Sequence, residues 1–192
     1  MSRGIRWAAE TDGTQNAPLQ LQGTPDSFVE IPNFPGSDID TRTSITLLMD
    51  VFPTGNRGSI LSFHEQGLGL QICLDGVMDE KGILTARFAR RDFSQPPALT
   101  KAVLKMNAWN FIGASYDLDS GIARLWHDGN EVEAKYIGRK LELATHCSIR
   151  IGALAVAVQR CFQGQVTDLH IFAESLGKDT IRAVGGIVPQ SV

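Results

Sequence analysis

The chain has 192 residues, 43% hydrophobic and 20% charged, a balance typical of a globular domain that excludes a largely disordered chain. It carries 18 Lys and Arg against 21 Asp and Glu, a formal net charge of −3, and its densest basic spot is Arg90-Arg91. This charge argues against a nucleic-acid-binding protein. No apolar run approaches the roughly 20 residues of a spanning helix, so we expect no membrane insertion of this segment.

Short apolar segments that alternate with polar residues recur along the chain, and turns rich in Gly, Pro, Asn or Asp close them. In chain order, the predicted strands cover residues 19–21, 28–31, 44–52, 60–63, 68–74, 83–88, 110–116, 122–126, 149–153 and 166–172. A period of two indicates strands with one buried face. We expect a core between two sheets that includes Ile112, Tyr116, Leu125, Ile151, Val166 and Ile171, and we also place Trp109 and Trp126 in the core.

Glycines and one helix complete the predicted elements. Asp128-Gly129 is typical of a tight hairpin turn, and Gly113 in its strand predicts the close approach of another chain. The only helix expected covers residues 176–184, with Ser175 as its N-cap and Gly185 past its end. No composition shift or repeat divides the chain. The pattern therefore predicts one all-β domain over residues 1–192, an antiparallel two-sheet jelly-roll sandwich with one short C-terminal helix.

Several segments, taken in order, resemble a known superfamily. They are residues 27–32 (SFVEIP), 41–47 (TRTSITL), 109–117 (WNFIGASYD), 121–129 (GIARLWHDG), 149–152 (IRIG) and 162–172 (FQGQVTDLHIF). Over nearly the whole chain, this order resembles the laminin G-like, concanavalin A-like jelly-roll superfamily, which includes the pentraxins. The resemblance implies a module excised from a larger extracellular or cell-surface protein, since the chain's N-terminus lacks the apolar stretch of a signal peptide.

The resemblance implies a non-catalytic recognition module that binds glycan or protein partners in adhesion, matrix or receptor ectodomains. One alternative is a glycoside hydrolase or polysaccharide lyase of the same fold. Glycoside hydrolysis needs two carboxylates about 5–9 Å apart, and the nearest candidate pair is Glu131 and Glu133, whose spacing also suits a solvated strand face. A second alternative is a structural spacer without a ligand.

Calcium is a candidate ligand, because many relatives in this superfamily hold Ca²⁺ at one rim. The segment 153–160, which is acidic in pentraxins, has no carboxylate here, so we expect no tight double site. Asp75, Asp79 and Glu80 could supply a single weak calcium site, and Asp38 and Asp40 form a second acidic pair. Asp near Gly is also an ordinary turn residue, and we expect no other cofactor.

Arg90 and Arg91 are the candidate ligand-binding residues. They begin a loop that runs into Pro96-Pro97 and could contact an acidic glycan at the rim of the sandwich. The alternative interpretation of this stretch is an ordinary solvated loop.

The three cysteines are Cys73, Cys147 and Cys161, and their spacing fits no zinc motif. Cys147 and Cys161 flank one predicted strand, so we expect a disulfide between them and an oxidising compartment. The alternative is three reduced thiols.

Overall fold

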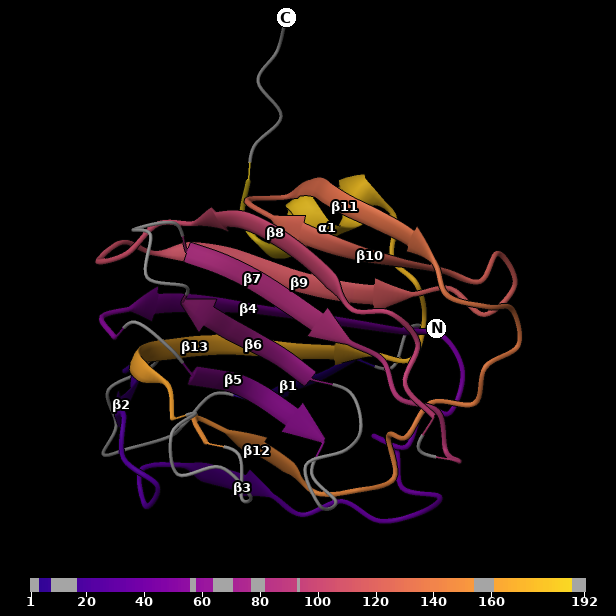
Figure 1. Cartoon of the computed structure of the whole chain (residues 1–192), viewed down its shortest axis with the longest axis horizontal. Helices are drawn as coiled ribbons and strands as arrows, with labels where there is room; N and C mark the ends of the chain where they lie inside the picture. The colour runs from indigo at the N-terminus through magenta and orange to yellow at the C-terminus, as the bar shows by residue number, and fades with distance from the viewer. Residues whose placement is uncertain are drawn as a thin grey trace, which may run out of the picture.

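The computed structural model describes residues 4–7, 17–55, 58–63, 71–76, 82–92, 94–153 and 161–187, with the backbone alone for 4–7 and 71–76. In the described part of the chain, two antiparallel sheets lie face to face and one short helix packs behind one of them (Figure 1). The predicted all-β sandwich with one C-terminal helix is therefore confirmed. No helix in the described part of the chain has the length and apolar character needed to span a membrane.

The seven-stranded sheet has the order β1-β13-β4-β9-β10-β11, and β2 pairs with one end of β13. Its strands are β1 (Gly4–Trp7), β2 (Leu19–Gln22), β4 (Ile45–Pro53), β9 (Asn110–Tyr116), β10 (Ile122–His127), β11 (Asn130–Tyr136) and β13 (Gln163–Phe172). The centre of this sheet brings together segments that are far apart in the sequence, because β4 lies between β13 and β9.

The six-stranded sheet has the order β3-β12-β5-β6-β7-β8 and forms the front layer of Figure 1. Its strands are β3 (Val29–Ile31), β5 (Gly58–Phe63), β6 (Gln71–Gly76), β7 (Gly82–Arg87), β8 (Leu99–Leu104) and β12 (Ile149–Ile151). Three strands of the fold, β1, β8 and β11 (Asn130–Tyr136), are absent from the predicted ranges. Strand β1 is only four residues long, and the middle of β8 and most of β11 are exposed, so none of the three has a clear alternation of apolar residues.

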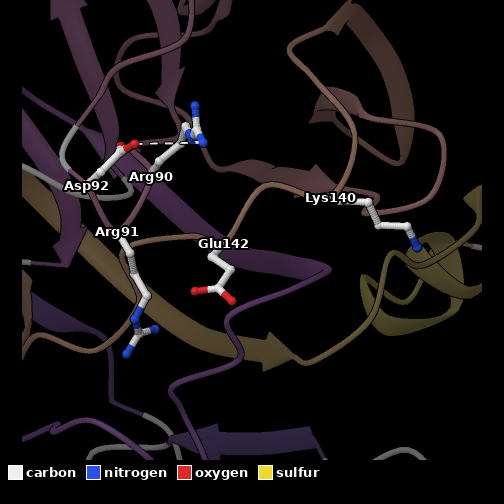
Figure 2. A pocket seen from close by; sticks show the side chains of 5 residues that line it. All are labelled: Arg90, Arg91, Asp92, Lys140 and Glu142. Atoms are coloured by element: carbon white, nitrogen blue, oxygen red, sulfur yellow. Dashed lines mark ion pairs between the residues drawn. The ribbon is translucent and has the colours of Figure 1, made fainter.

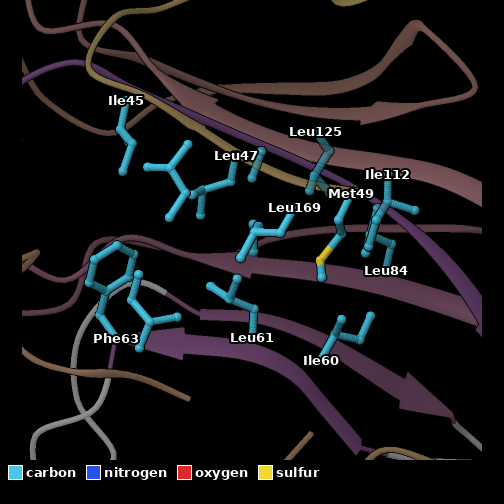
Figure 3. Close-up of a cluster of buried hydrophobic side chains, with 14 of the residues drawn as sticks. Ile45, Leu47, Met49, Ile60, Leu61, Phe63, Leu84, Ile112, Leu125 and Leu169 are labelled. Carbon is cyan, nitrogen blue, oxygen red and sulfur yellow. The ribbon is translucent and has the colours of Figure 1, made fainter. Parts of the chain in front are cut away.

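The core lies between the two sheets, where apolar side chains from both layers point toward one another (Figure 3). The six aliphatic and tyrosine residues predicted between the sheets each have at most 6% of their surface exposed. The hydroxyl of Tyr116 donates to the carbonyl oxygen of Gly138 (2.9 Å) and accepts from the backbone N–H of Leu141 (3.0 Å). The core therefore buries this polar group without leaving it unsatisfied.

The predicted hairpin turn and glycine contact are also present. Asp128 and Gly129 both have positive φ (47° and 69°), as a two-residue turn between β10 and β11 requires. A Cβ at Gly113 would lie 2.8 Å from the carbonyl oxygen of Leu47 and 2.5 Å from Cδ2 of Leu48, so only glycine lets these neighbouring strands pack as they do.

Helix α1 (Lys178–Val184) covers part of the outer face of the seven-stranded sheet. Its N-cap is Gly177 and not the predicted Ser175. Leu176, which lies between them, donates its N–H to the hydroxyl of Thr46 in β4 (2.9 Å). Ile181 anchors the helix against Leu48, Phe111 and Trp126.

The prediction for the tryptophans is half wrong. Trp126 is buried, although under α1 and not between the sheets, and its Nε1 donates to Oγ of Ser115 (2.9 Å). Trp109 is 43% exposed. It lies one residue before β9, and the strand register continues it onto the outer face of the sheet, opposite Phe52.

Substitutions in the core and at the edge should separate clearly. Leu125→Ala should lower the free energy of unfolding by about 2–5 kcal/mol, because it empties a packed site between the sheets. Lys135→Ala on the exposed edge strand β11 should change it by at most about 0.5 kcal/mol. Chemical denaturation measures both, and equal stability of the two variants would contradict the assigned core.

Candidate functional site

Arg90 and Arg91 lie where the chain leaves the six-stranded sheet, and both line an open hollow of about 230 Å³ (Figure 2). The other lining residues are Asp92, Lys140 and Glu142. Backbone pairing joins the two sides of the hollow, because Arg90 bridges Leu143 and the N–H of Arg91 donates to the carbonyl oxygen of Glu142 (2.9 Å). The predicted ligand-binding residues therefore lie at a surface hollow.

The two arginines do different things there. Both terminal nitrogens of Arg91 donate to the buried carboxylate of Asp40, Nη1 to Oδ1 at 2.7 Å and Nη2 to Oδ2 at 2.9 Å. The backbone N–H of Gly36 (2.9 Å) and the hydroxyl of Thr145 (3.1 Å) also donate to this carboxylate. The guanidinium of Arg91 thus ties the loop before β4 to the chain after β7.

The electrostatics of Asp40 follow from these contacts. Burial alone would raise the pKa of its carboxyl, but the hydrogen bonds from Arg91, Gly36 and Thr145 outweigh burial and hold the pKa well below its usual range. Hydrogen bonding to Asp40 raises the pKa of Arg91 in turn. The second predicted acidic pair, Asp38 and Asp40, therefore has one member already committed to an arginine.

The remaining charges of the hollow nearly balance. Arg90 lies 3.7 Å from Asp92, Lys140 pairs with Asp119, and Glu142 faces solvent. Figure 2 shows Lys140 directed away from Arg91 and Glu142, so the cations do not converge. An anionic ligand would meet two carboxylates here as well as the cations. The expectation that this stretch binds an acidic glycan stays a prediction that now depends on Arg90 and Lys140.

The structure describes only one of the three predicted calcium residues. Asp75 lies in β6, paired with Ile83 of β7, whereas Asp79 and Glu80 lie outside the described residues. Across the described ranges, no three His, Cys, Asp or Glu side chains form a group that could hold a metal ion. A weak calcium site at Asp75, Asp79 and Glu80 therefore stays a prediction.

The predicted disulfide is not formed: Cys147 and Cys161 are both buried, and no S–S bond joins them. Cys147 lies two residues before β12, whereas Cys161 pairs with Ala153, two residues after that strand. Six residues of extended chain span about 20 Å, and bridged cysteines need Cα atoms within about 7 Å. The flanking strand that suggested the pairing is thus the element that separates the two thiols.

The candidate glycosidase acids lie on the exposed edge strand β11. Glu131 accepts a hydrogen bond from Nε of Arg124 (3.0 Å), and Glu133 lies 3.6 Å from Nζ of Lys101. Each carboxylate is matched to its own cation, as in ordinary surface ion pairs.

A second surface, which the sequence did not predict, lies on the outer face of the seven-stranded sheet beyond α1. Asp50 and Phe52 of β4 point outward there, because Met49 and Val51 between and beside them point into the core. The ring of Phe52 meets the exposed indole of Trp109 edge-on, with centroids 5.6 Å apart. We call Asp50, Phe52 and Trp109 the Trp109 surface.

A buried asparagine holds the loop before Trp109 in place. The side chain of Asn110 accepts from the N–H of Lys105 (2.8 Å) and donates to the carbonyl oxygens of Lys105 (2.9 Å) and Ala108 (2.8 Å). The N–H of Asn107 donates to the carbonyl oxygen of Pro53 at the end of β4 (2.8 Å). Trp109 is therefore presented on a fixed backbone, as a preorganised binding residue would be.

Asp50 is the polar member of this surface. Burial, and then the charges of Asp168 and Asp128, raise the pKa of its carboxyl to about 6. Its neighbours across the register are Thr167 in β13 and Phe111 in β9. No described residue donates a hydrogen bond to Asp50. The surface thus combines an exposed aromatic ring with a half-buried carboxylate whose hydrogen-bonding capacity is unused.

Arg90 and Arg91 offer a matched pair of variants. Arg91→Met should lower the free energy of unfolding by about 2–5 kcal/mol, because it removes the two-point ion pair to the buried carboxylate of Asp40 and leaves only Nε of the half-exposed Arg42, 3.4 Å from Oδ2. Arg90→Met should change it by at most about 0.5 kcal/mol, because the pair with Asp92 is exposed. Urea denaturation compares the two, and a mild effect of Arg91→Met would refute the structural role of that ion pair.

The raised pKa of Asp50 gives a pH-dependent prediction. In the folded protein the raised pKa keeps this proton bound up to about pH 6, whereas an ordinary aspartate releases it near pH 3.8, so the contribution of Asp50 to stability falls as pH rises from about 4 to 6. Asp50→Asn should therefore raise the free energy of unfolding at pH 7.5 by about 1 kcal/mol, allowing for solvent screening. The gain should vanish near pH 4, and a loss of stability at pH 7.5 would contradict the assignment.

Solved structures share this fold at low sequence identity. The receptor-binding domain of botulinum neurotoxin D aligns with a TM-score of 0.70 and 12% identity over 95% of this chain and 48% of that one. The serotype G binding domain gives 0.71 and 13% over 96% and 46%. A heptameric SAP-like pentraxin from Limulus polyphemus gives 0.66 and 14% over 87% and 80%.

This chain therefore spans about half the length of the toxin binding domains that it matches. No protein-family model matches the sequence, and no curated protein sequence matches it significantly. At these identities the structural matches establish the fold, a two-sheet jelly-roll sandwich shared with pentraxins, and leave the function to be argued from the site.

Proposed function

We propose that the chain is a non-catalytic, laminin G-like recognition module that binds a glycan or protein partner through the Trp109 surface. The observation that carries the proposal is the exposure of Trp109 on a rigid backbone, at the part of the sheet that α1 leaves uncovered. Exposed tryptophan supplies a large, flat, apolar contact with few rotatable bonds, which is why it anchors many protein interfaces and sugar sites.

The polar group beside the indole suits recognition. Binding sites combine apolar area with a few polar groups that fix the orientation of the ligand. Asp50 offers an acceptor that no described residue uses, and it lies on the same strand face as Phe52. An acidic or hydroxyl-rich partner could also reach the hollow at Arg90, but its nearly balanced charge makes it the weaker candidate.

Known proteins of this fold support a binding role without fixing one. Two matched structures are named as a receptor-binding domain and a binding domain, and another as a binding domain in complex with rat synaptotagmin II. The enzyme alternative is weakened because its nearest acid pair, Glu131 and Glu133, is engaged by cations. The spacer alternative gives no reason for a rigidly held, exposed indole.

An extracellular or cell-surface location, as one module of a larger protein, belongs to the same proposal. It is supported by the resemblance of the sequence to laminin G-like modules. The absence of a bond between Cys147 and Cys161 removes the independent support that a disulfide would have given.

The test compares two exposed aromatic residues that lie on different parts of the same sheet. The wild-type protein, Trp109→Ala and Tyr136→Ala are screened on a glycan array and against extracellular-matrix extract, with hydrolysis of β-glucans assayed in parallel. Tyr136, which is 66% exposed at the end of β11, is the control.

We expect Trp109→Ala to reduce binding to the captured ligand at least tenfold and Tyr136→Ala to leave it unchanged. Equal binding by all three proteins would refute the Trp109 surface as the site. Hydrolysis that requires Glu131 or Glu133 would refute the non-catalytic assignment.

A further inference from the structure

Arg150 binds an acidic and an aromatic side chain that are two residues apart in the same extended segment. Glu30 in β3 and Phe28 just before it are two residues apart, and Arg150 reaches both from the adjacent strand β12. Its Nη2 lies 2.7 Å from Oε2 of Glu30, and its guanidinium carbon lies 4.1 Å from the centre of the Phe28 ring. A single guanidinium therefore makes an ion pair and a cation–π contact at once.

Asp50 and Phe52 repeat this spacing on β4, and alternate residues of a strand lie about 7 Å apart on the same face. The neighbouring strands supply no cation at the matching positions. Strand β13 places Thr167 and Gln165 opposite the two residues, and the β9 side places Phe111 and Trp109 there. The acid and aromatic side chains are present without the arginine.

The charge around Asp50 favours a cation from outside. The carboxylate of Asp50 forms no ion pair with a described residue. Lys105 instead pairs with the nearby Asp128, with Nζ 3.4 Å from Oδ2. Burial and two neighbouring carboxylates make the ionised form of Asp50 costly, and its pKa of about 6 still leaves it mostly ionised at pH 7. A bound cation would offset this cost.

From this complementarity we propose that the Trp109 surface binds an arginine side chain of a partner protein. The guanidinium pairs with the carboxylate of Asp50 and stacks on the exposed indole of Trp109, as Arg150 pairs with Glu30 and covers Phe28. This inference rests on the proposed recognition function and narrows it to one class of partner, a protein with an accessible basic segment.

The test uses N-acetyl-L-arginine amide as the probe and its citrulline analogue as the uncharged, nearly isosteric control. Both are titrated into the full chain at pH 7.5, and the indole ¹⁵N–H signal of Trp109 is followed by NMR. Asp50→Asn removes the proposed acceptor, and Asp92→Asn removes an exposed acid at the hollow as a matched control.

We expect the arginine probe to bind with millimolar affinity and the citrulline analogue to bind at least tenfold more weakly. Asp50→Asn should weaken the arginine probe at least fivefold, and Asp92→Asn should leave it unchanged. Because Asp50→Asn removes a carboxylate without a donor, the variant should fold, and the comparison between arginine and citrulline on the wild-type protein does not depend on it.

Equal binding of the two probes, or an arginine affinity that Asp50→Asn does not lower, would overturn the inference. The proposed recognition function would still hold in that case if Trp109→Ala abolished binding of a captured glycan or protein. Failure of the recognition proposal looks different, because binding would then be insensitive to Trp109 altogether.

Discussion

Strand β4 contributes alternate residues to the core between the sheets and to the outer face of its own sheet, and the rest of the structure depends on this alternation. Its alternate residues Ile45, Leu47, Met49 and Val51 are buried between the sheets, which fixes the register with β9 and β13. A shift by one residue would exchange the two faces. The core therefore dictates that Thr46, Leu48, Asp50 and Phe52 point outward.

The outward row is then divided by the C-terminal helix. Thr46 hydrogen-bonds the chain just before α1, and Leu48 packs under Ile181. The helix therefore covers this half of the outer face. Asp50 and Phe52 lie beyond the helix and meet Trp109. The site costs stability, since Asp50 is half-buried without a donor and Trp109 leaves apolar surface in water. Residues that are unfavourable for folding and grouped on one rigid surface are the usual mark of a binding role.

The sandwich, its core residues and the hairpin at Asp128-Gly129 could be predicted because each depends on local alternation or turn chemistry. The functions of individual charged residues could not. Arg90 and Arg91 are adjacent in sequence, and only the fold brings Asp40 to one of them. The same holds for Trp109, whose exposure follows from its register with Phe52, a residue 57 positions earlier in the chain. The period-two spacing of Asp50 and Phe52 was the one sequence signal for this surface. It can be interpreted only by comparison with Glu30 and Phe28, which Arg150 contacts in the folded protein.

We propose that this protein meets its partner at the Trp109 surface and not at the hollow at Arg90. Backbone amide shifts of the labelled chain, recorded with and without a captured partner, distinguish the two sites. We expect the largest changes on the amides of Asp50, Phe52 and Trp109 and on the indole of Trp109. Changes confined to residues 90–92 and 140–142 would contradict this proposal and would place the binding site at the hollow.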